Sequence, residues 1–225
     1  MSHKAILKEL ERLYPDARPQ LDFTNPYETL VATILSAQCT DARVNQVTPA
    51  VFERFPTVEA MAQTDPEILY PMVRSCGFKS KAENIVNACR MIVSEFSGQV
   101  PSTMEELTRL PGVGRKTANV VLAFAFGQDA IPVDTHVFRV ANRLGIARAD
   151  TPEKVERQLM EAFPKNTWSR VHHWLIYHGR RVCHSQKPDC VSCTLKPWCA
   201  FHNGDLSCDR KASDRSGRKA DKHGS

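Results

Sequence analysis

Apolar residues recur along most of the chain with the spacing of amphipathic helices. In the first segment, Ile6, Leu7, Leu10 and Leu13 fall on one helix face, with charged residues between them. No stretch shows the period-2 alternation that marks a strand. The pattern predicts an all-α fold. The expected helices cover residues 3–14, 26–38, 42–54, 58–63, 66–75, 80–96, 103–109, 115–126, 135–144, 152–163 and 168–182.

Capping chemistry supports several of these helix starts. An N-cap residue followed by a first-turn proline or a capping-box acid is typical of a helix N-terminus. The sequence offers four such starts, at Asn25 with Pro26 and Glu28, Asp65 with Pro66, Ser102 with Glu105, and Thr151 with Pro152.

Composition and charge narrow the class of protein. The chain has 225 residues and is 42% hydrophobic, which suits an ordinary globular core. Its N-terminus lacks the apolar run of a secretory signal, and its longest apolar run, Val120 to Phe126, is too short to cross a bilayer. We therefore expect a protein inside the cell with no membrane segment.

The net charge of +5 admits a polyanionic partner without establishing one. Residues 209–225 carry six Lys or Arg and three Asp, so this segment holds +3 of the total. It has almost no apolar residues, and we expect residues 205–225 to form a disordered tail.

Four cysteines lie close together after the last predicted helix. Cys183, Cys190, Cys193 and Cys199 follow the spacing C-x6-C-x2-C-x5-C, in a stretch too short to have its own core. Four thiolates suit either a tetrahedral zinc ion or a cubane iron-sulfur cluster. Zinc ribbons usually pair two C-x2-C units, and this stretch has one. The remaining cysteines are scattered and are expected to be small buried or incidental thiols: Cys39, Cys76, Cys89 and Cys208.

The stretch LPGVGRKTAN predicts a helix, a glycine turn and a second helix. Gly112 and Gly114 allow the main chain to approach a ligand closely, and backbone N–H groups at the start of the second helix form a ready phosphate site. A plain turn between antiparallel helices explains the glycines equally well.

Lys116 favours the functional interpretation of this turn. In the first turn of a helix its charge meets the positive end of the dipole, which favours the neutral and nucleophilic amine. Contact with a phosphate is the simpler role for this lysine. Asp134, in VDTHVFRVANRLG, is expected to be the N-cap of the next helix. A carboxylate held there could also accept a proton from the amine or stabilise a cationic sugar.

These segments, together with LSAQCTD and the four-cysteine spacing, resemble the endonuclease III family of bifunctional DNA glycosylases and abasic-site lyases. The resemblance runs from about residue 3 to residue 200. It implies a helix-hairpin-helix base-excision fold with two helical domains and a DNA-binding cleft between them. The implied domains are a six-helix barrel over 22–131 and an iron-sulfur domain formed by 1–21 with 132–204.

The resemblance also implies residue roles. Lys116 aligns with the nucleophilic lysine, Asp134 with the catalytic aspartate, and the four cysteines with the ligands of a 4Fe-4S cluster, in preference to zinc. Gln38 matches the glutamine that fills the gap left by the flipped nucleotide. The other implied DNA contacts are Gly112, Val113, Gly114, Arg115, His136, Arg139 and Lys187.

Two positions depart from the family pattern. The segment before the KAEN helix is one residue short, which puts Gly77 or Phe78 where the family places a bulky wedge, and Phe78 is favoured. Asp189 stands where more basic relatives carry positive charge, and this should weaken DNA binding or change its salt dependence.

The implied activity is the removal of oxidised pyrimidines from double-stranded DNA and cleavage at abasic sites, by a monomeric bacterial-type protein of the cytoplasm. One alternative is a monofunctional mismatch glycosylase of the same superfamily, which typically lacks the lysine at position 116. A second alternative is a non-catalytic DNA-binding protein with a metal cluster, which would have no reason to keep Lys116 and Asp134 together.

Overall fold

The computed structural model describes residues 3–204, and all regular structure in that range is helical. Each of the eleven helices expected from the sequence is present, so the predicted all-α class is confirmed. The helices are α1 (His3–Leu13), α2 (Pro26–Ser36), α3 (Asp41–Arg54), α4 (Val58–Ala62), α5 (Pro66–Val73), α6 (Lys79–Glu95), α7 (Met104–Arg109), α8 (Arg115–Ala125), α9 (Thr135–Leu144), α10 (Pro152–Ala162) and α11 (Trp168–Arg181). Three short 3₁₀ helices lie at Arg74–Cys76, Lys165–Thr167 and Lys196–Trp198.

Three of the four expected helix caps are confirmed, and one is wrong. Asn25, Asp65 and Thr151 each accept a backbone N–H from the first turn of their helix. The cap of α7 is Thr103 and not Ser102: Thr103 accepts from the Glu106 N–H at 3.3 Å and donates its hydroxyl to the Glu106 carboxylate at 2.7 Å. The capping box therefore lies one residue later than its sequence signature suggested, because either hydroxyl is followed three residues later by a glutamate.

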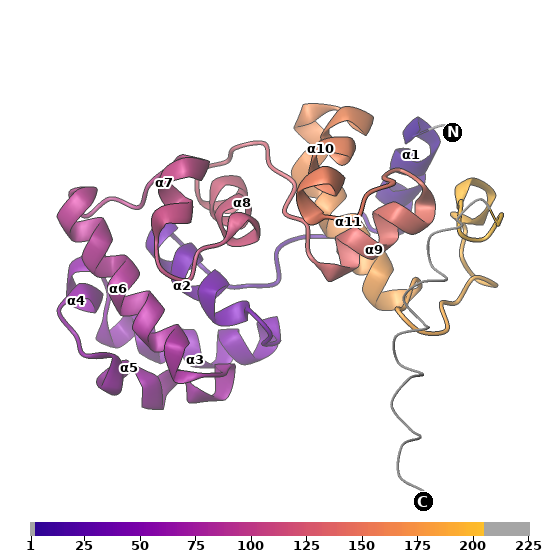
Figure 1. The fold of residues 1–225 in the computed structure, drawn as a ribbon. Helices are drawn as coiled ribbons and strands as arrows, with labels where there is room; N and C mark the ends of the chain where they lie inside the picture. Colours follow the sequence, from indigo (N-terminus) through magenta and orange to yellow (C-terminus); the bar gives the residue numbers. More distant parts are fainter. Residues whose placement is uncertain (1–2, 205–225) are drawn as a thin grey trace, which may run out of the picture.

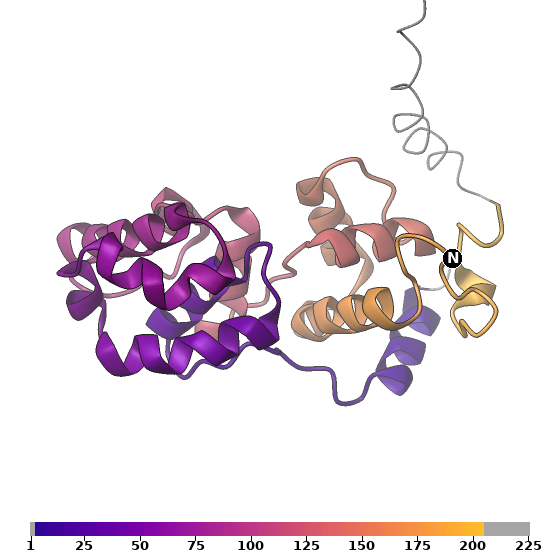
Figure 2. The same cartoon turned by 90° about the horizontal axis from the view of Figure 1, so that it is seen from below.

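The helices pack into two lobes, each around its own core (Figure 1). The first core comes from α2 to α8 and contains residues between Tyr27 and Leu122. The second core combines α1 with α9, α10 and α11, and includes Ile6, Ile131 and Leu195. In the view from below, two extended segments run between the lobes (Figure 2). The chain therefore enters the first lobe after α1 and returns to the second after α8.

Ile131 packs into the second core, at the expected boundary between 22–131 and the division formed by 1–21 with 132–204. The exact domain boundaries stay a prediction. The expected disorder of residues 205–225 and the position of Cys208 lie outside the described residues. None of the helices in residues 3–204 combines the length and apolar character needed to span a membrane.

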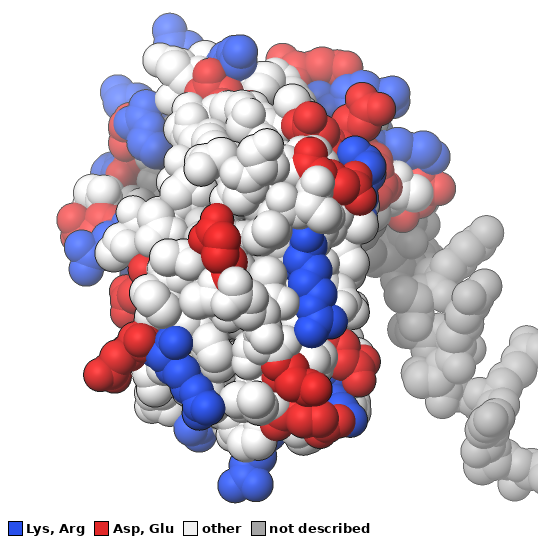
Figure 3. Space-filling model, turned by 90° about the vertical axis from the view of Figure 1, so that its left-hand side faces the viewer, with Lys and Arg blue, Asp and Glu red and all other residues white. Residues whose placement is uncertain are grey.

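The far end of the first lobe has a mixed surface (Figure 3). Acidic and basic side chains are interspersed there among uncharged ones, with no gathering of Lys and Arg alone on this face. A surface that follows a nucleic-acid backbone is usually basic along its length. This face therefore lacks the charge pattern of a DNA-binding surface.

Candidate active site

The turn between α7 and α8 requires glycine at position 112. Gly112 has a φ of 77°, and a Cβ built there would lie 2.9 Å from Cβ of Asn84 on α6. The turn is closed by a hydrogen bond from the Val113 N–H to the Leu110 carbonyl at 3.1 Å. The Val113 side chain is buried in the first core, so it anchors the turn and does not face solvent. A DNA contact by Val113 stays a prediction.

Gly114 has no comparable structural reason to be glycine. It is the N-cap of α8 with a φ of −89°, and a Cβ built there would meet nothing within 4 Å. Because glycine offers no capping side chain, the first-turn N–H groups of α8 receive no acceptor from this residue. The positive end of the dipole and open space above the main chain suit an anionic ligand that approaches the backbone closely.

Lys116 and Asp134 line one cavity, which answers a question that the sequence left open. Lys116 is exposed in the first turn of α8. Asp134 is the N-cap of α9, as predicted, and its Oδ1 accepts the Val137 N–H at 2.7 Å. The cap uses one carboxylate oxygen and leaves Oδ2 for the cavity. No ion pair joins the two residues in the part of the chain that the structure describes, so the cavity separates an amine from a carboxylate.

Aromatic side chains wall this cavity. The ring centroid of Phe124 lies 5.0 Å from that of His173, which lies 4.9 Å from that of His172. His172 Nδ1 donates to the Pro132 carbonyl at 2.7 Å. Burial lowers the pKa of His172 to about 3, and the Lys116 charge adds to this effect; burial also lowers the pKa of His173 to about 3. Both imidazoles are therefore neutral at pH 7, and among the described residues His173 Nε2 is buried without a hydrogen-bond partner.

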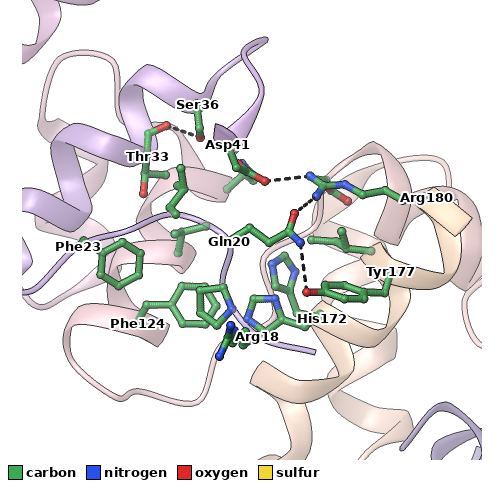
Figure 4. Close-up of a pocket in the computed structure, with 17 residues that line it drawn as sticks. Arg18, Gln20, Phe23, Thr33, Ser36, Asp41, Phe124, His172, Tyr177 and Arg180 are labelled. Carbon is green, nitrogen blue, oxygen red and sulfur yellow. Dashed lines mark hydrogen bonds and ion pairs between the residues drawn. The ribbon is translucent and has the colours of Figure 1, made fainter. Parts of the chain in front are cut away.

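Polar residues from both lobes meet at the mouth of the cavity (Figure 4). Arg180 on α11 donates to Gln20 Oε1 at 2.6 Å and to Asp41 Oδ2 at 3.1 Å, and Gln20 donates to the Tyr177 hydroxyl at 3.1 Å. Gln20 belongs to the segment between α1 and α2, and Asp41 begins α3. The cavity therefore lies between the lobes and is bridged at one side by these hydrogen bonds.

The sequence did not indicate these wall and mouth residues. His172 and His173 fall on the apolar pattern of α11, so they look like core residues, and Gln20 lies in a connecting segment with no motif. The adjacent histidines within the mostly apolar run 171–176 were the one available signal, because two neutral imidazoles in a core need polar partners.

Gln38 and Phe78 lie at exposed positions, as their predicted roles require. Gln38 follows the end of α2 with a φ of 58°, a left-handed conformation that is uncommon for a residue other than glycine. Phe78 is the N-cap of α6 and is 78% exposed, unusually high for a phenylalanine. Gly77 has a φ of 131°, which suits a turn residue, and without a side chain it cannot act as a bulky wedge. The wedge role of Phe78 stays a prediction.

Arg115 is engaged within the protein. Its guanidinium forms a bidentate pair with Glu156 on α10, at 2.9 Å from Nε to Oε2 and 2.7 Å from Nη2 to Oε1. The Glu156 side chain is only 5% exposed. This pair ties the start of α8, and with it Lys116, to the second lobe. The predicted DNA contact by Arg115 stays a prediction.

His136 and Arg139 hold α9 against the end of α11. Arg139 donates to the carbonyls of Gly179 and Cys183 at 3.0 and 3.1 Å, and its Nη2 lies 3.1 Å from His136 Nδ1. Burial lowers the pKa of Arg139. The geometry gives Arg139 a structural role, and the DNA contacts predicted for Arg139 and His136 stay predictions.

The four predicted cysteine ligands face one small cavity between the end of α9 and the C-terminal loop. Cys183 Sγ lies 3.6 Å from Arg143 Nη1, and Cys193 Sγ lies 3.6 Å from Nε2 of the buried His178. The same loop carries Lys187, which is exposed with a φ of 49°.

Four thiols suit either a single tetrahedral ion or a multinuclear cluster, and the 4Fe-4S assignment stays a prediction. No group of three or more His, Cys, Asp or Glu within residues 3–204 is arranged to hold one metal ion. A zinc ion needs four sulfurs about 2.3 Å from a single point. A 4Fe-4S group takes one thiolate on each of four irons, so its sulfurs are spread around a larger volume.

Comparisons with known proteins agree with the fold. A family model described as HhH-GPD superfamily base excision DNA repair protein matches residues 31–165. The endonuclease III of Synechocystis sp. is 53% identical over 196 residues, covering 86% of this chain and 90% of that protein. The endonuclease III of Bacillus subtilis is 43% identical over 220 residues, covering 97% and 94%.

Solved structures give the same result. A trapped endonuclease III–DNA covalent intermediate matches with a TM-score of 0.85 and 44% identity, covering 91% of this chain and 99% of that chain. A thermostable thymine-DNA glycosylase matches with a TM-score of 0.79 at 21% identity, which shows a shared fold alone.

Proposed function

The chain belongs to the endonuclease III family of base-excision DNA repair proteins, and from this premise we propose that it removes oxidised pyrimidines from duplex DNA and cuts the strand at the resulting abasic site. The observation that carries the proposal is the single cavity that contains Lys116, Asp134 and an aromatic wall. Nucleophile, carboxylate and stacking surface are the three parts that this reaction needs.

DNA would be held through its backbone at the hairpin. The α8 N-terminus offers main-chain N–H groups with no side-chain cap, and Gly114 leaves open space above them. Contacts of this kind fix the register of the duplex without reading its sequence. Two structural neighbours are endonuclease III–DNA complexes, which supports DNA as the partner of this chain.

The damaged base would leave the helix and enter the cavity. A base inside the stack cannot be reached at its glycosidic carbon, and flipping costs least for a lesion with weakened stacking. Phe124 and His173 offer ring faces on which a flipped pyrimidine can stack, and both histidines are neutral, so they can hydrogen-bond to a base without adding charge. Gln38 and Phe78 would occupy the space that the flipped nucleotide leaves.

Lys116 would supply the nucleophile. Its Nζ attacks C1′ of the sugar, the glycosidic bond breaks, and the base leaves with the bonding electrons and takes up a proton. Opening of the sugar ring gives a Schiff base between Nζ and C1′. Loss of the acidified C2′ proton then expels the 3′ phosphate by β-elimination, and water hydrolyses the imine to free Lys116.

Asp134 would assist this step from the α9 N-cap. Its Oδ2, which the cap does not use, can accept a proton from the lysine ammonium and oppose positive charge on the sugar. Helix α9 fixes the carboxylate through the hydrogen bond to Val137, so the group requires no rearrangement during the reaction.

A 4Fe-4S cluster would be held by Cys183, Cys190, Cys193 and Cys199. When bound, it supplies the bonds that order a loop with too few apolar residues to fold alone. That loop carries Lys187, a candidate phosphate contact. Arg143 and His178 approach two of the sulfurs and would stabilise them in the thiolate form.

The function is tested by comparing Lys116→Gln with the control Lys165→Gln, which changes an exposed lysine that does not line the cavity. Each protein is mixed with duplex DNA containing thymine glycol, and base release and strand cleavage are measured separately. We expect Lys116→Gln to lose both and the control to retain both. Full strand cleavage by Lys116→Gln would overturn the assignment, and base release without cleavage by the wild type would establish a monofunctional glycosylase.

A further inference from the structure

Lys81 makes an unusual set of contacts in the first lobe. It lies in the first turn of α6, and its ammonium donates to three main-chain carbonyls: Leu35 at 2.8 Å, Ala37 and Cys76. An ammonium has three N–H donors, so these contacts use all of them. Lys81 is therefore not available to bind a phosphate, and a direct DNA contact does not explain it.

The three carbonyls belong to two separate segments of chain. Leu35 and Ala37 lie at the end of α2, immediately before Gln38. Cys76 ends the 3₁₀ helix that precedes Gly77 and Phe78. The ammonium thus joins the segment that carries Gln38 to the segment that carries Phe78.

Two residues with positive φ directly follow two of the residues whose carbonyls Lys81 contacts, and the glycine among them leaves room for the lysine side chain. Gln38 holds a left-handed φ of 58°, and Gly77 a φ of 131°. A Cβ at Gly77 would lie 3.2 Å from Lys81 Nζ and 3.4 Å from its Cε, so glycine leaves room for the lysine stem. Lys81 is half-buried, and burial lowers its pKa, although the carbonyls favour the charged form.

We propose that Lys81 is a positioning residue for DNA opening: its ammonium ties the α2–α3 turn to the start of α6, so that Gln38 and Phe78 enter the duplex as one unit. The inference rests on the proposed function, because it assumes that these two side chains enter DNA. It adds a residue that touches neither DNA nor the reacting atoms and acts through Gln38 and Phe78.

A double-mutant cycle tests this role. The variants are Lys81→Met, which keeps the aliphatic stem, and the control Lys79→Met, which removes an exposed ammonium two residues away. Each is made in the wild-type chain and in a Gln38→Ala/Phe78→Ala background. Duplex opening is followed by the fluorescence of 2-aminopurine opposite an abasic site, base removal by single-turnover kinetics on duplex thymine glycol, and lysine chemistry by borohydride trapping on a single-stranded abasic oligonucleotide.

We expect Lys81→Met to lower opening and single-turnover base removal by about 10- to 100-fold, as for a misplaced positioning group. Single-strand trapping should change less than about twofold, and in the Gln38→Ala/Phe78→Ala background Lys81→Met should have almost no further effect. Parallel loss of opening and trapping, an undiminished effect in that background, or no loss of opening would overturn the proposal.

Two further comparisons cover a Lys81→Met variant that does not fold and a wild type without glycosylase or lyase activity. If Lys81→Met does not fold, Lys81→Arg replaces it, and a defect in opening without a defect in trapping again supports the role while parallel loss overturns it. A wild type that opens the duplex but neither releases base nor traps would refute the proposed function alone, since the fluorescence comparison between wild type and variant still tests Lys81.

Discussion

Asp134 caps α9 and is proposed to act as a general base in the cavity, and two substitutions separate these two roles. Asp134→Asn keeps an oxygen acceptor for the Val137 N–H, whereas Asp134→Ala removes it. Loss of the cap costs about 1 kcal/mol, with a range of roughly 0.5–2. Loss of the negative charge at the α9 N-terminus costs a further 0.3–1 kcal/mol or so and affects both variants. The alanine variant should therefore be about 1 kcal/mol less stable than the asparagine variant.

Activity should not follow stability. Both substitutions remove the carboxylate from the cavity, and removal of a general base typically lowers the rate by about 10²- to 10⁴-fold. Urea unfolding gives the free energies of unfolding, and single-turnover release of thymine glycol gives the rates. For a chain of this length, 1 kcal/mol corresponds to a shift in Tm of about 2–4 °C, so thermal unfolding provides a second measure.

Asp65→Ala is the matched control for the cap. Asp65 caps α5 through the Glu67 N–H at 2.9 Å and lies in the first lobe outside the cavity. We expect it to lose about 1 kcal/mol of stability with unchanged activity. Near-normal activity of Asp134→Asn would refute the catalytic task, and equal stability of the two Asp134 variants would refute the capping argument.

Three further results follow from the geometry. Gly112→Ala should lower the free energy of unfolding in urea by about 1–2 kcal/mol, because the φ of Gly112 is 77°. Gly114→Ala should keep its stability and bind abasic duplex more weakly. A stable Gly112→Ala together with a destabilised Gly114→Ala would contradict the roles given to the two glycines. Arg115→Met should lower the free energy of unfolding by about 2–3 kcal/mol, because Glu156 is left buried and unpaired. The double variant with Glu156→Leu should recover most of this loss in urea unfolding, and a single variant as stable as the wild type would contradict the argument. Burial lowers the pKa of His173 to about 3, so the unfolded chain binds the proton more readily, and stability should fall as the pH drops from about 6.5 towards 3. His173→Gln should lessen this dependence in urea unfolding at pH 7 and pH 5; an unchanged slope would contradict it.

Local patterns were sufficient to predict the helices and most of their caps. The apolar period and the caps at Asn25, Asp65 and Thr151 depend on neighbouring residues alone, and the structure has all of them. Asp134 was predicted as a cap for the same reason. Ser102 and Thr103 could not be separated, because each has a glutamate three residues later and the choice depends on how α7 packs.

Tertiary relationships were beyond the sequence patterns. Lys116 and Asp134 are eighteen residues apart, and only the packing of the lobes brings them to one cavity. His172 and His173 look like apolar-face residues of α11 until Phe124 is placed beside them. Lys81 looks like a surface lysine, since the carbonyls that it joins come from residues 35, 37 and 76.

The most direct test of the mechanism is to map the covalent adduct. The wild-type protein is trapped with borohydride on duplex DNA containing an abasic site, digested with nuclease and protease, and sequenced by mass spectrometry. We predict that the reduced sugar remnant lies on Nζ of Lys116. A remnant on any other lysine or on the N-terminal amine would contradict the central claim that the amine at the start of α8 is the nucleophile.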